Sequence, residues 1–166
     1  MRLIVELSGE HPELPFAELQ VVGEVIDKRP QVAVVESRDP WSARRLAMAH
    51  SVLEYLGDSP ADPAAFLSMV RDLGITADCP FAARVKKIAG SAWNVTVPDL
   101  ERRIGSIIRG KVDLDDPGCE YRAILSGDRC YFGKVIFHGE RPSYELRRPG
   151  SRTFFHPGVM MPRLAR

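Results

Sequence analysis

The sequence is poor in cysteine. It holds only Cys79, Cys119 and Cys130, and no two of them form a Cys-x-x-Cys pair. An odd and widely spaced set of this kind argues against a disulfide framework and against a zinc site. A reducing compartment is the simplest expectation, and we expect the protein to be cytoplasmic.

Long hydrophobic runs are also missing. The apolar run Leu3–Val5 near the start is interrupted by Glu6 and is too short for a signal peptide. No stretch approaches the roughly 20 apolar residues that cross a bilayer as a helix. We therefore expect no membrane partner.

The usual motifs for nucleotide binding and nucleophilic catalysis are absent. There is no Gly-x-Gly-x-x-Gly loop, no Walker loop and no Gly-x-Ser-x-Gly elbow. The histidines lie far apart without ligand neighbours and fit surface or packing positions (His11, His50, His138 and His156). Three aspartates lack the central Gly and later Glu of an EF-hand and fit a solvated turn (Asp113, Asp115 and Asp116). We predict no catalytic residue, no metal ligand and no cofactor site in this chain.

The formal net charge of +1 hides an uneven distribution. Residues 1–30 contain six acidic and three basic residues, whereas residues 141–166 contain six arginines against Glu145 alone. Such an asymmetry predicts that a polyanion is bound by the second half of the chain.

The stretch from Phe81 to Lys111 is the most informative part of the sequence. Residues 81–87 alternate, with Phe81, Ala83 and Val85 on one face and basic residues on the other, as expected of a half-buried strand. Residues 98–110 carry apolar side chains at spacings of three and four, with Pro98 at the start and Gly110 at the end, which predicts an amphipathic helix. Asp99 and Glu101 are its only acids, so the stretch has the charge expected of a phosphate-binding surface.

Each basic group also has a plainer explanation, because charged residues on strands and helices are normally solvated. The combination of a basic strand, a basic helix and an arginine-rich end favours phosphate binding, for which arginine forks are well suited. Trp93 lies in the loop between strand and helix, where it either stacks on a base or anchors the loop in the core. The predicted RNA-binding residues are Arg84, Lys86, Lys87, Arg102, Arg103, Arg109 and Lys111, followed by Arg147, Arg148 and Arg152.

The remaining pattern predicts an α/β (α+β) protein in two units. A strand–helix–strand–helix–strand unit ends at the turn-forming residues Gly57–Pro60. A second unit begins with a helix and continues through the basic strand and helix into a hairpin turned at Gly127-Asp128. The expected strands are 2–7, 31–36, 51–56, 81–88, 120–125, 130–137 and an edge strand at 143–147, and the expected helices are 15–26, 41–50, 64–73 and 98–110.

The order of these features resembles a THUMP domain, an RNA-binding module of tRNA-modifying enzymes. The resemblance rests on Phe81–Lys87, Leu100–Gly105, Val112–Leu114 with Pro117, Tyr121–Leu125 and Tyr131–Gly133. The first unit is similar to the ferredoxin-like domain that precedes THUMP in such enzymes. The resemblance implies a ferredoxin-like domain at 1–58, a THUMP domain at 59–149 and a linker at 150–166.

The flanking segments resemble the archaeal tRNA guanine-N2 methyltransferases that modify guanosine at position ten. They are Val5–Glu10, Arg45–His50, Arg148-Pro149, Phe154–Gly158 and Pro162–Arg166. The family's S-adenosylmethionine loop and its Asp-Pro-Pro-Tyr-type motif are missing, and Asp116-Pro117-Gly118 does not match that motif. The resemblance therefore implies a tRNA-binding module for the acceptor stem and 3′ end. S-adenosylmethionine would belong to a catalytic domain outside this chain.

Other functions remain open at this stage. The module could serve another THUMP enzyme, of the 4-thiouridine synthetase or pseudouridine synthase type. It could also be an assembly domain whose apolar segment Phe154–Met161 docks a separate methyltransferase chain. An enzyme in its own right is disfavoured, because the sequence offers no nucleophile–base pair and no metal constellation.

Overall fold

The computed structural model describes residues 1–139 of the chain. The predicted edge strand at 143–147, the predicted linker at 150–166 and the predicted RNA contacts Arg147, Arg148 and Arg152 lie outside the described residues. The described elements are β1 (Arg2–Leu7), α1 (Leu14–Glu18), η1 (Leu19–Val21), β2 (Glu24–Arg29), β3 (Val32–Glu36), η2 (Pro40–Arg45), β4 (Ala49–Pro60), α2 (Pro63–Asp72), β5 (Phe81–Lys87), α3 (Val97–Ile107), β6 (Cys119–Ser126) and β7 (Arg129–His138).

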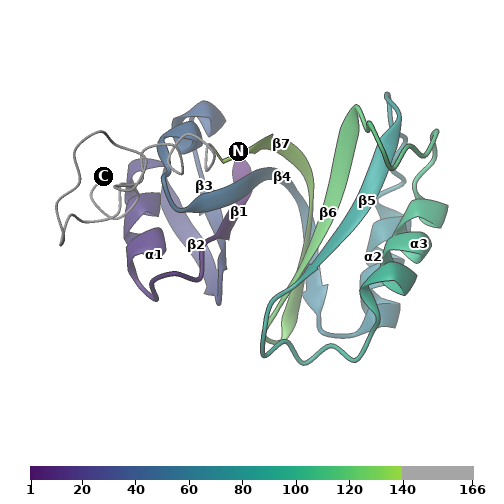
Figure 1. Ribbon diagram of the computed structural model, residues 1–166, viewed down its shortest axis with the longest axis horizontal. Helices are drawn as coiled ribbons and strands as arrows, with labels where there is room; N and C mark the ends of the chain where they lie inside the picture. The colour runs from purple at the N-terminus through teal and green to yellow at the C-terminus, as the bar shows by residue number, and fades with distance from the viewer. Residues whose placement is uncertain (140–166) are drawn as a thin grey trace, which may run out of the picture.

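One seven-stranded sheet runs through the described part of the molecule in the order β2-β3-β1-β4-β7-β6-β5. The β5–β6 pair is parallel and the other neighbouring pairs are antiparallel. The two long strands β4 and β7 pair along most of their length, from Ser51–His138 to Pro60–Arg129, with two register shifts. Bulges bend strands, and Figure 1 shows β4 and β7 arching from one half of the molecule to the other.

Each half of the sheet carries its helices on its outer face. In the first half, Leu3 and Val5 of β1 pack against Leu19 and Val22. In the second half, α2 and α3 cover β5, β6 and β7 (Figure 1), and the core contains the following large side chains: Phe66, Phe81, Leu100, Ile104, Tyr121 and Phe132. The strands contribute to these cores because side chains alternate along a strand, so that every second one faces the helices.

The inner faces of the two halves meet in a third apolar cluster. Ile4 and Val34 of the first half join Ile124 and Tyr131 of the second half there. The alternation in β1 places Leu3 and Val5 outward and Ile4 inward, so β1 contributes to cores on both of its faces. The two halves are therefore joined by packed side chains as well as by β4 and β7.

Two predicted helices of the first half are wrong in extent. The helix expected over 15–26 ends after one short helix and one 3-10 turn, and Glu24–Arg29 forms strand β2. Gly23 lies so close to β3 that an added Cβ would collide with the backbone carbonyl of Glu36. The helix expected over 41–50 is the shorter 3-10 helix η2, and Ala49 already begins β4. Pairing with neighbouring strands outweighs local helical spacing in both places.

The turn expected at Gly57–Pro60 is also wrong, because these residues lie inside β4. Gly57 follows a register shift, and the Met69 sulfur of α2 occupies the place where its Cβ would project. A glycine at a bulge in a long strand produces the same local composition as a turn. The division of the chain at residues 58 and 59 stays a prediction.

The second half agrees with expectation. Helices α2 and α3 and strands β5, β6 and β7 lie within a few residues of their predicted limits. Asp62 caps α2 by accepting hydrogen bonds from the Ala64 and Ala65 amides. The mixed α/β fold class is thus confirmed by the seven-stranded sheet and its helices.

The cysteines differ from expectation in one respect. Cys79 and Cys119 form a disulfide between the segment before β5 and the start of β6, with a Cα–Cα distance of 6.0 Å. Their separation of 40 residues hid this contact, because parallel pairing of β5 and β6 brings the two strand starts together. Cys130 is free and buried, and burial raises the pKa of its thiol. Within residues 1–139, no helix is long and apolar enough to cross a membrane.

Candidate nucleic-acid interface

Strand β5 divides its side chains as the sequence predicts. Phe81 and Ala83 are buried against α2 and α3. Lys86 is exposed on the other face and Arg84 is partly exposed. The basic face of β5 is therefore accessible along the part of the strand that its apolar residues hold in place.

A groove lies between the edge of β5, helix α3 and the segment that follows α3. Its volume is about 500 Å³, and it is lined by Ala83, Arg84, Pro98, Glu101, Arg102, Gly105, Ser106, Val112 and Leu114. Arg84 donates from Nη2 to the Leu114 carbonyl at 2.8 Å, which ties β5 to that segment. Glu101 Oε1 accepts a hydrogen bond from the Val85 amide at 2.9 Å and so provides a partner for one backbone amide on the open edge of β5. We call these lining residues the α3 groove.

The α3 groove combines cations with an apolar floor. Arg102 is exposed on α3, and Val112 and Leu114 are 49% and 57% exposed. Gly105 leaves the groove open, since a Cβ there would meet nothing within 4 Å. An arginine pair beside exposed apolar side chains suits a nucleotide, whose phosphate is anionic and whose base and ribose have apolar faces.

Besides Arg84, two of the predicted cations are already engaged. Lys87 donates from Nζ to the Trp93 carbonyl. Arg103 pairs with Asp99, one turn away on α3, at 3.0 Å. Trp93 is 2% exposed and packs edge-on against Phe66, so the anchoring interpretation is confirmed and base stacking on this residue is excluded.

Arg109 and Lys111 lie at the opposite end of β5 from Lys86. The Lys111 carbonyl accepts from the Phe81 amide, at the first residue of β5. The Arg109 carbonyl accepts a hydrogen bond from the Ala77 amide, and the Arg109 amide donates to the Ile75 carbonyl. A strand of this length spans roughly 20 Å, so the predicted cations form a string along the strand and do not form one cluster.

One charged group has partners that the sequence pattern does not reveal. Arg122 of β6 is the register partner of Arg84 and lies on the inner face of the sheet. It donates to Glu6 Oε2 at 2.6 Å and from Nε to Glu120 Oε1 at 2.7 Å. Ser51 also donates to Glu6, at 2.6 Å. No local spacing links residues 6, 51 and 122: Glu6 and Ser51 are opposite each other in the β1–β4 pair, and the bend of the sheet brings Arg122 of β6 to them.

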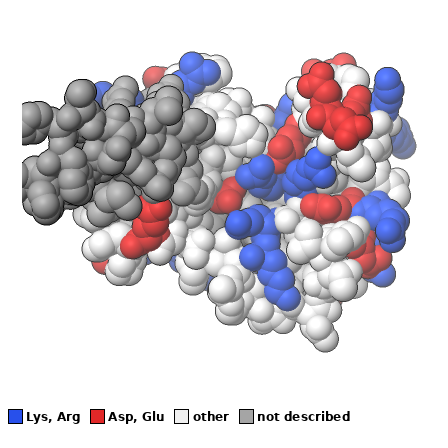
Figure 2. Space-filling view, in the orientation of Figure 1, with Lys and Arg blue, Asp and Glu red and all other residues white. Residues whose placement is uncertain are grey.

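The electrostatics of this inner cluster are balanced. Burial raises the pKa of Glu6, but the Ser51 hydroxyl and the Arg122 guanidinium outweigh burial and hold that pKa below its usual value. A hollow of about 320 Å³ beside the cluster is lined by Arg84, Lys86 and Arg122 and also by three carboxylates, Glu6, Glu101 and Glu120. Figure 2 shows the same mixture, with groups of blue side chains over the half that carries β5, β6 and α3 and red side chains between them.

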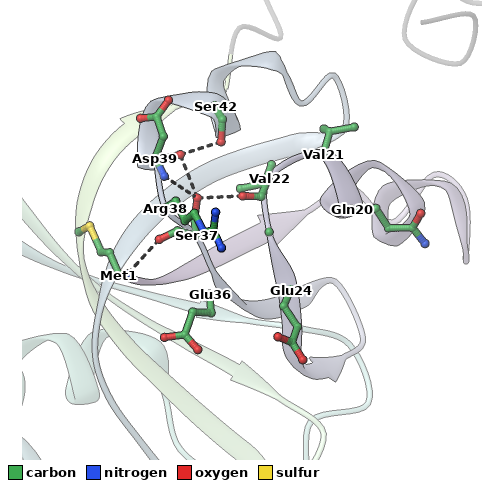
Figure 3. Close-up of a pocket in the computed structure, with 11 residues that line it drawn as sticks. Met1, Gln20, Val21, Val22, Glu24, Glu36, Ser37, Arg38, Asp39 and Ser42 are labelled. Atoms are coloured by element: carbon green, nitrogen blue, oxygen red, sulfur yellow. Dashed lines mark hydrogen bonds between the residues drawn. The ribbon is translucent and has the colours of Figure 1, made fainter.

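A second, larger hollow in the first half has a different character. It measures about 780 Å³ and lies around the loop after β3. Ser37 holds this loop by donating to the Val22 carbonyl and accepting from the Met1 amino group at its own carbonyl (Figure 3). Glu24 and Glu36 are opposite each other across the β2–β3 pair. Glu24, Glu36 and Asp39 outnumber Arg38 in the lining, so this hollow is a poor site for a phosphate.

The described part of the chain offers few groups of side chains that could bind a metal ion or a cofactor. Asp78, Cys79 and Cys119 are the one group of possible ligands close enough together among residues 1–139. Both sulfurs are consumed by the disulfide, so this group does not fit a metal ion. Asp78 pairs instead with Lys134 at 3.4 Å.

Comparison with known proteins identifies the relatives of this chain. No family model matches it. A tRNA (guanine(10)-N2)-dimethyltransferase from Methanothermobacter thermautotrophicus is 35% identical over 182 residues, covering 100% of this chain and 53% of the relative. The enzyme of the same name from Methanocaldococcus jannaschii is 26% identical, covering 96% and 54%. The chain thus spans about half the length of the curated relatives it matches.

Solved structures agree on the fold. TrmN from Thermus thermophilus superposes with a TM-score of 0.60 at 17% identity, covering 89% of this chain and 50% of that one. The expected THUMP resemblance is confirmed. Over its whole length, this chain is a homologue of about half of a tRNA (guanine(10)-N2)-dimethyltransferase, and it has the α/β fold of the THUMP-containing proteins.

Proposed function

We propose that this chain is the tRNA-recognition module of a tRNA guanine-N2 methyltransferase. In this proposal it binds the acceptor stem near the 3′ end, and a catalytic domain outside this chain binds S-adenosylmethionine and transfers the methyl group. The names of the relatives support the substrate class. The chain itself is not an enzyme in this proposal.

The α3 groove is the observation that carries the proposal. It brings Arg84 from β5 and Arg102 from α3 to one hollow, and Arg84 also lines the hollow that contains the exposed Lys86. The apolar side chains Val112 and Leu114 stand on the same hollow. A single-stranded 3′ end offers both phosphates and unstacked bases, and A-form stems are bound mainly through shape and phosphate.

The chemistry of the module is therefore positioning. Arginine forks hold phosphates in a fixed geometry, and the string of cations along β5 continues toward Arg109 and Lys111. The third apolar cluster, which contains Ile4 and Tyr131, packs the two halves against each other. The module would hold the stem at a set distance from the methyl-transferring site.

Charge reversal provides the direct test. Arg84→Glu with Lys86→Glu is expected to weaken binding to a tRNA transcript at least tenfold at about 0.1 M salt, because two phosphate contacts become repulsions. Binding would be measured across a salt series, where the slope should fall by about two charges. The matched control is Arg2→Glu with Arg71→Glu, two exposed arginines outside the α3 groove.

The 3′ end is tested with a shortened transcript. The proposal expects affinity to drop when the single-stranded 3′ nucleotides are removed. Equal affinity of the reversal variant and the control, with both folded by circular dichroism, would remove Arg84 and Lys86 from the site. No binding of the unaltered chain at low salt would favour the assembly module that docks a separate catalytic chain.

A further inference from the structure

We propose that the exposed indole of Trp41 is a second RNA contact, a platform on which one unpaired base stacks while Arg44 and Arg45 meet the adjoining phosphate. This inference rests on the proposed function and extends it to the first half of the molecule. Trp41 lies in η2, on the opposite half from the α3 groove. It is 52% exposed, which is unusual for the largest aromatic side chain.

The backbone under Trp41 is firmly held. The Trp41 amide donates to Asp39 Oδ1 at 3.0 Å, and Ser42 donates to the Asp39 carbonyl at 2.6 Å. Ala43 and Leu46 of the same segment are buried in the first core. The indole is therefore presented by an anchored turn, so little conformational entropy is lost when a ligand binds.

Within residues 1–139, the ring and cation contacts of Trp41 lie on one face of the indole, and the side chain is 52% exposed. The Phe137 ring stacks on Trp41 with centroids 5.9 Å apart, and the Arg44 guanidinium lies 4.4 Å from the indole centre. Arg44 is also 5.4 Å from the Phe137 ring. Contacts on opposite faces of the indole would be more than about 7 Å apart at these distances. Phe137 and Arg44 therefore occupy the same side.

The charge around the platform suits a nucleic acid. Three exposed arginines, Arg38, Arg44 and Arg45, lie within eight residues, and none forms an ion pair within the described part of the chain. The one acid of the segment, Asp39, accepts from the Trp41 amide. An aromatic face beside unpaired cations is the arrangement that binds single-stranded RNA.

The two tryptophans make a spectroscopic test possible. Trp93 is buried and Trp41 is exposed, so a Trp93→Phe chain reports on Trp41 alone. Emission would be followed during titration with a tRNA transcript and with a hexauridylate, and acrylamide quenching would be measured with and without RNA. We expect the emission to fall by more than half and the acrylamide quenching constant to fall at least twofold.

The affinity test uses substitutions of the platform. Trp41→Ala is expected to weaken tRNA binding at least fivefold, because one stacked base is lost. Trp41→Phe should stay within threefold, since a ring is retained. The matched control is Ile26→Ala, which removes a similarly exposed apolar side chain of β2, 47% exposed, and should leave affinity unchanged.

The outcomes separate this inference from the proposed function. Binding that depends on Arg84 and Lys86 without change in Trp41 emission would overturn the platform and leave the proposed function standing. Failure of tRNA to bind would contradict the proposed function, and the hexauridylate titration would then decide the platform alone. Acrylamide protection of Trp41 before RNA is added would show that another part of the protein covers it and would also overturn the inference.

Discussion

At the scale of single residues, the feature that most affects stability is the buried pair of Glu6 and Arg122. The side chain of Glu6 is 5% exposed and that of Arg122 is 17% exposed. A buried carboxylate without a cation is costly, whereas a buried pair with additional hydrogen bonds is tolerated. Ser51 and Glu120 supply those bonds.

We predict that Arg122→Met lowers the free energy of unfolding at pH 7 by about 3–5 kcal/mol, because Glu6 loses its cation. In the unaltered protein the pKa of Glu6 is lowered, so its contribution is present above the unfolded pKa of about 4.5 and is lost as the pH falls through the folded pKa. In the variant, the Arg122 interactions that lower this pKa are lost while burial still raises it, so we expect the variant to lose less stability on acidification than the unaltered protein.

The difference between the two proteins should therefore shrink between pH 7 and pH 4. Urea denaturation at both pH values measures it. Glu6→Gln with Arg122→Met is the companion variant, and it should be more stable than Arg122→Met alone at pH 7. If the loss of unfolding free energy caused by Arg122→Met were the same at both pH values, the unpaired charge of Glu6 would not be its cause.

The sequence predicted residues well where their neighbours are local. Arg84 and Lys86 alternate with Phe81 and Ala83, and the structure places them on the expected faces. Their role as phosphate contacts stays a prediction. The Glu6–Arg122 pair was not predictable, because its members are 116 residues apart and meet only across the bend of the sheet.

At the scale of elements, helix α3 contains a glycine that its local packing does not require. Gly105 lies in the interior of Val97–Ile107, and an added Cβ would meet nothing within 4 Å. Gly105→Ala is expected to raise the free energy of unfolding by about 0.5–1 kcal/mol, since glycine is a poor helix former. Thermal and urea denaturation would measure the gain.

A larger side chain at the same position tests the α3 groove. Gly105→Trp should fold, because the added ring projects into the open groove, and it should weaken tRNA binding at least fivefold by filling that space. Gly105→Ala is the matched control and should bind almost as well as the unaltered chain. If Gly105→Trp binds tRNA normally, the RNA does not enter the α3 groove.

Elements were predictable where periodicity and boundaries agreed. Helix α2 has an apolar face, and both of its limits were predicted to within one residue. Strand β2 was missed, because Val25 and Ile26 continue the helical spacing of Phe16, Leu19 and Val22. These residues form a strand because they pair with β3, and the local sequence pattern does not reveal that pairing.

At the scale of the whole molecule, the Cys79–Cys119 disulfide closes a loop that contains β5 and α3. A loop of this length stabilises by about 4 kcal/mol in the chain-entropy model. We predict that reduction lowers the free energy of unfolding by that order, measured by urea denaturation with and without reductant. Thiol titration of the denatured, unreduced chain should detect Cys130 alone, and three reactive thiols would contradict the prediction.

The long strands β4 and β7 also affect how the protein is made. Ile136 and Phe137, near the end of β7, pack on the core of the first half, and β7 covers the edge of β4. During synthesis, the strands of the amino-terminal half are therefore made first, but β4 lacks its partner β7 until roughly residue 138 has left the ribosome. The sheet therefore cannot be completed in the order in which its strands are synthesised. A nascent chain halted before β7 would leave the edge of β4 unpaired and prone to aggregation.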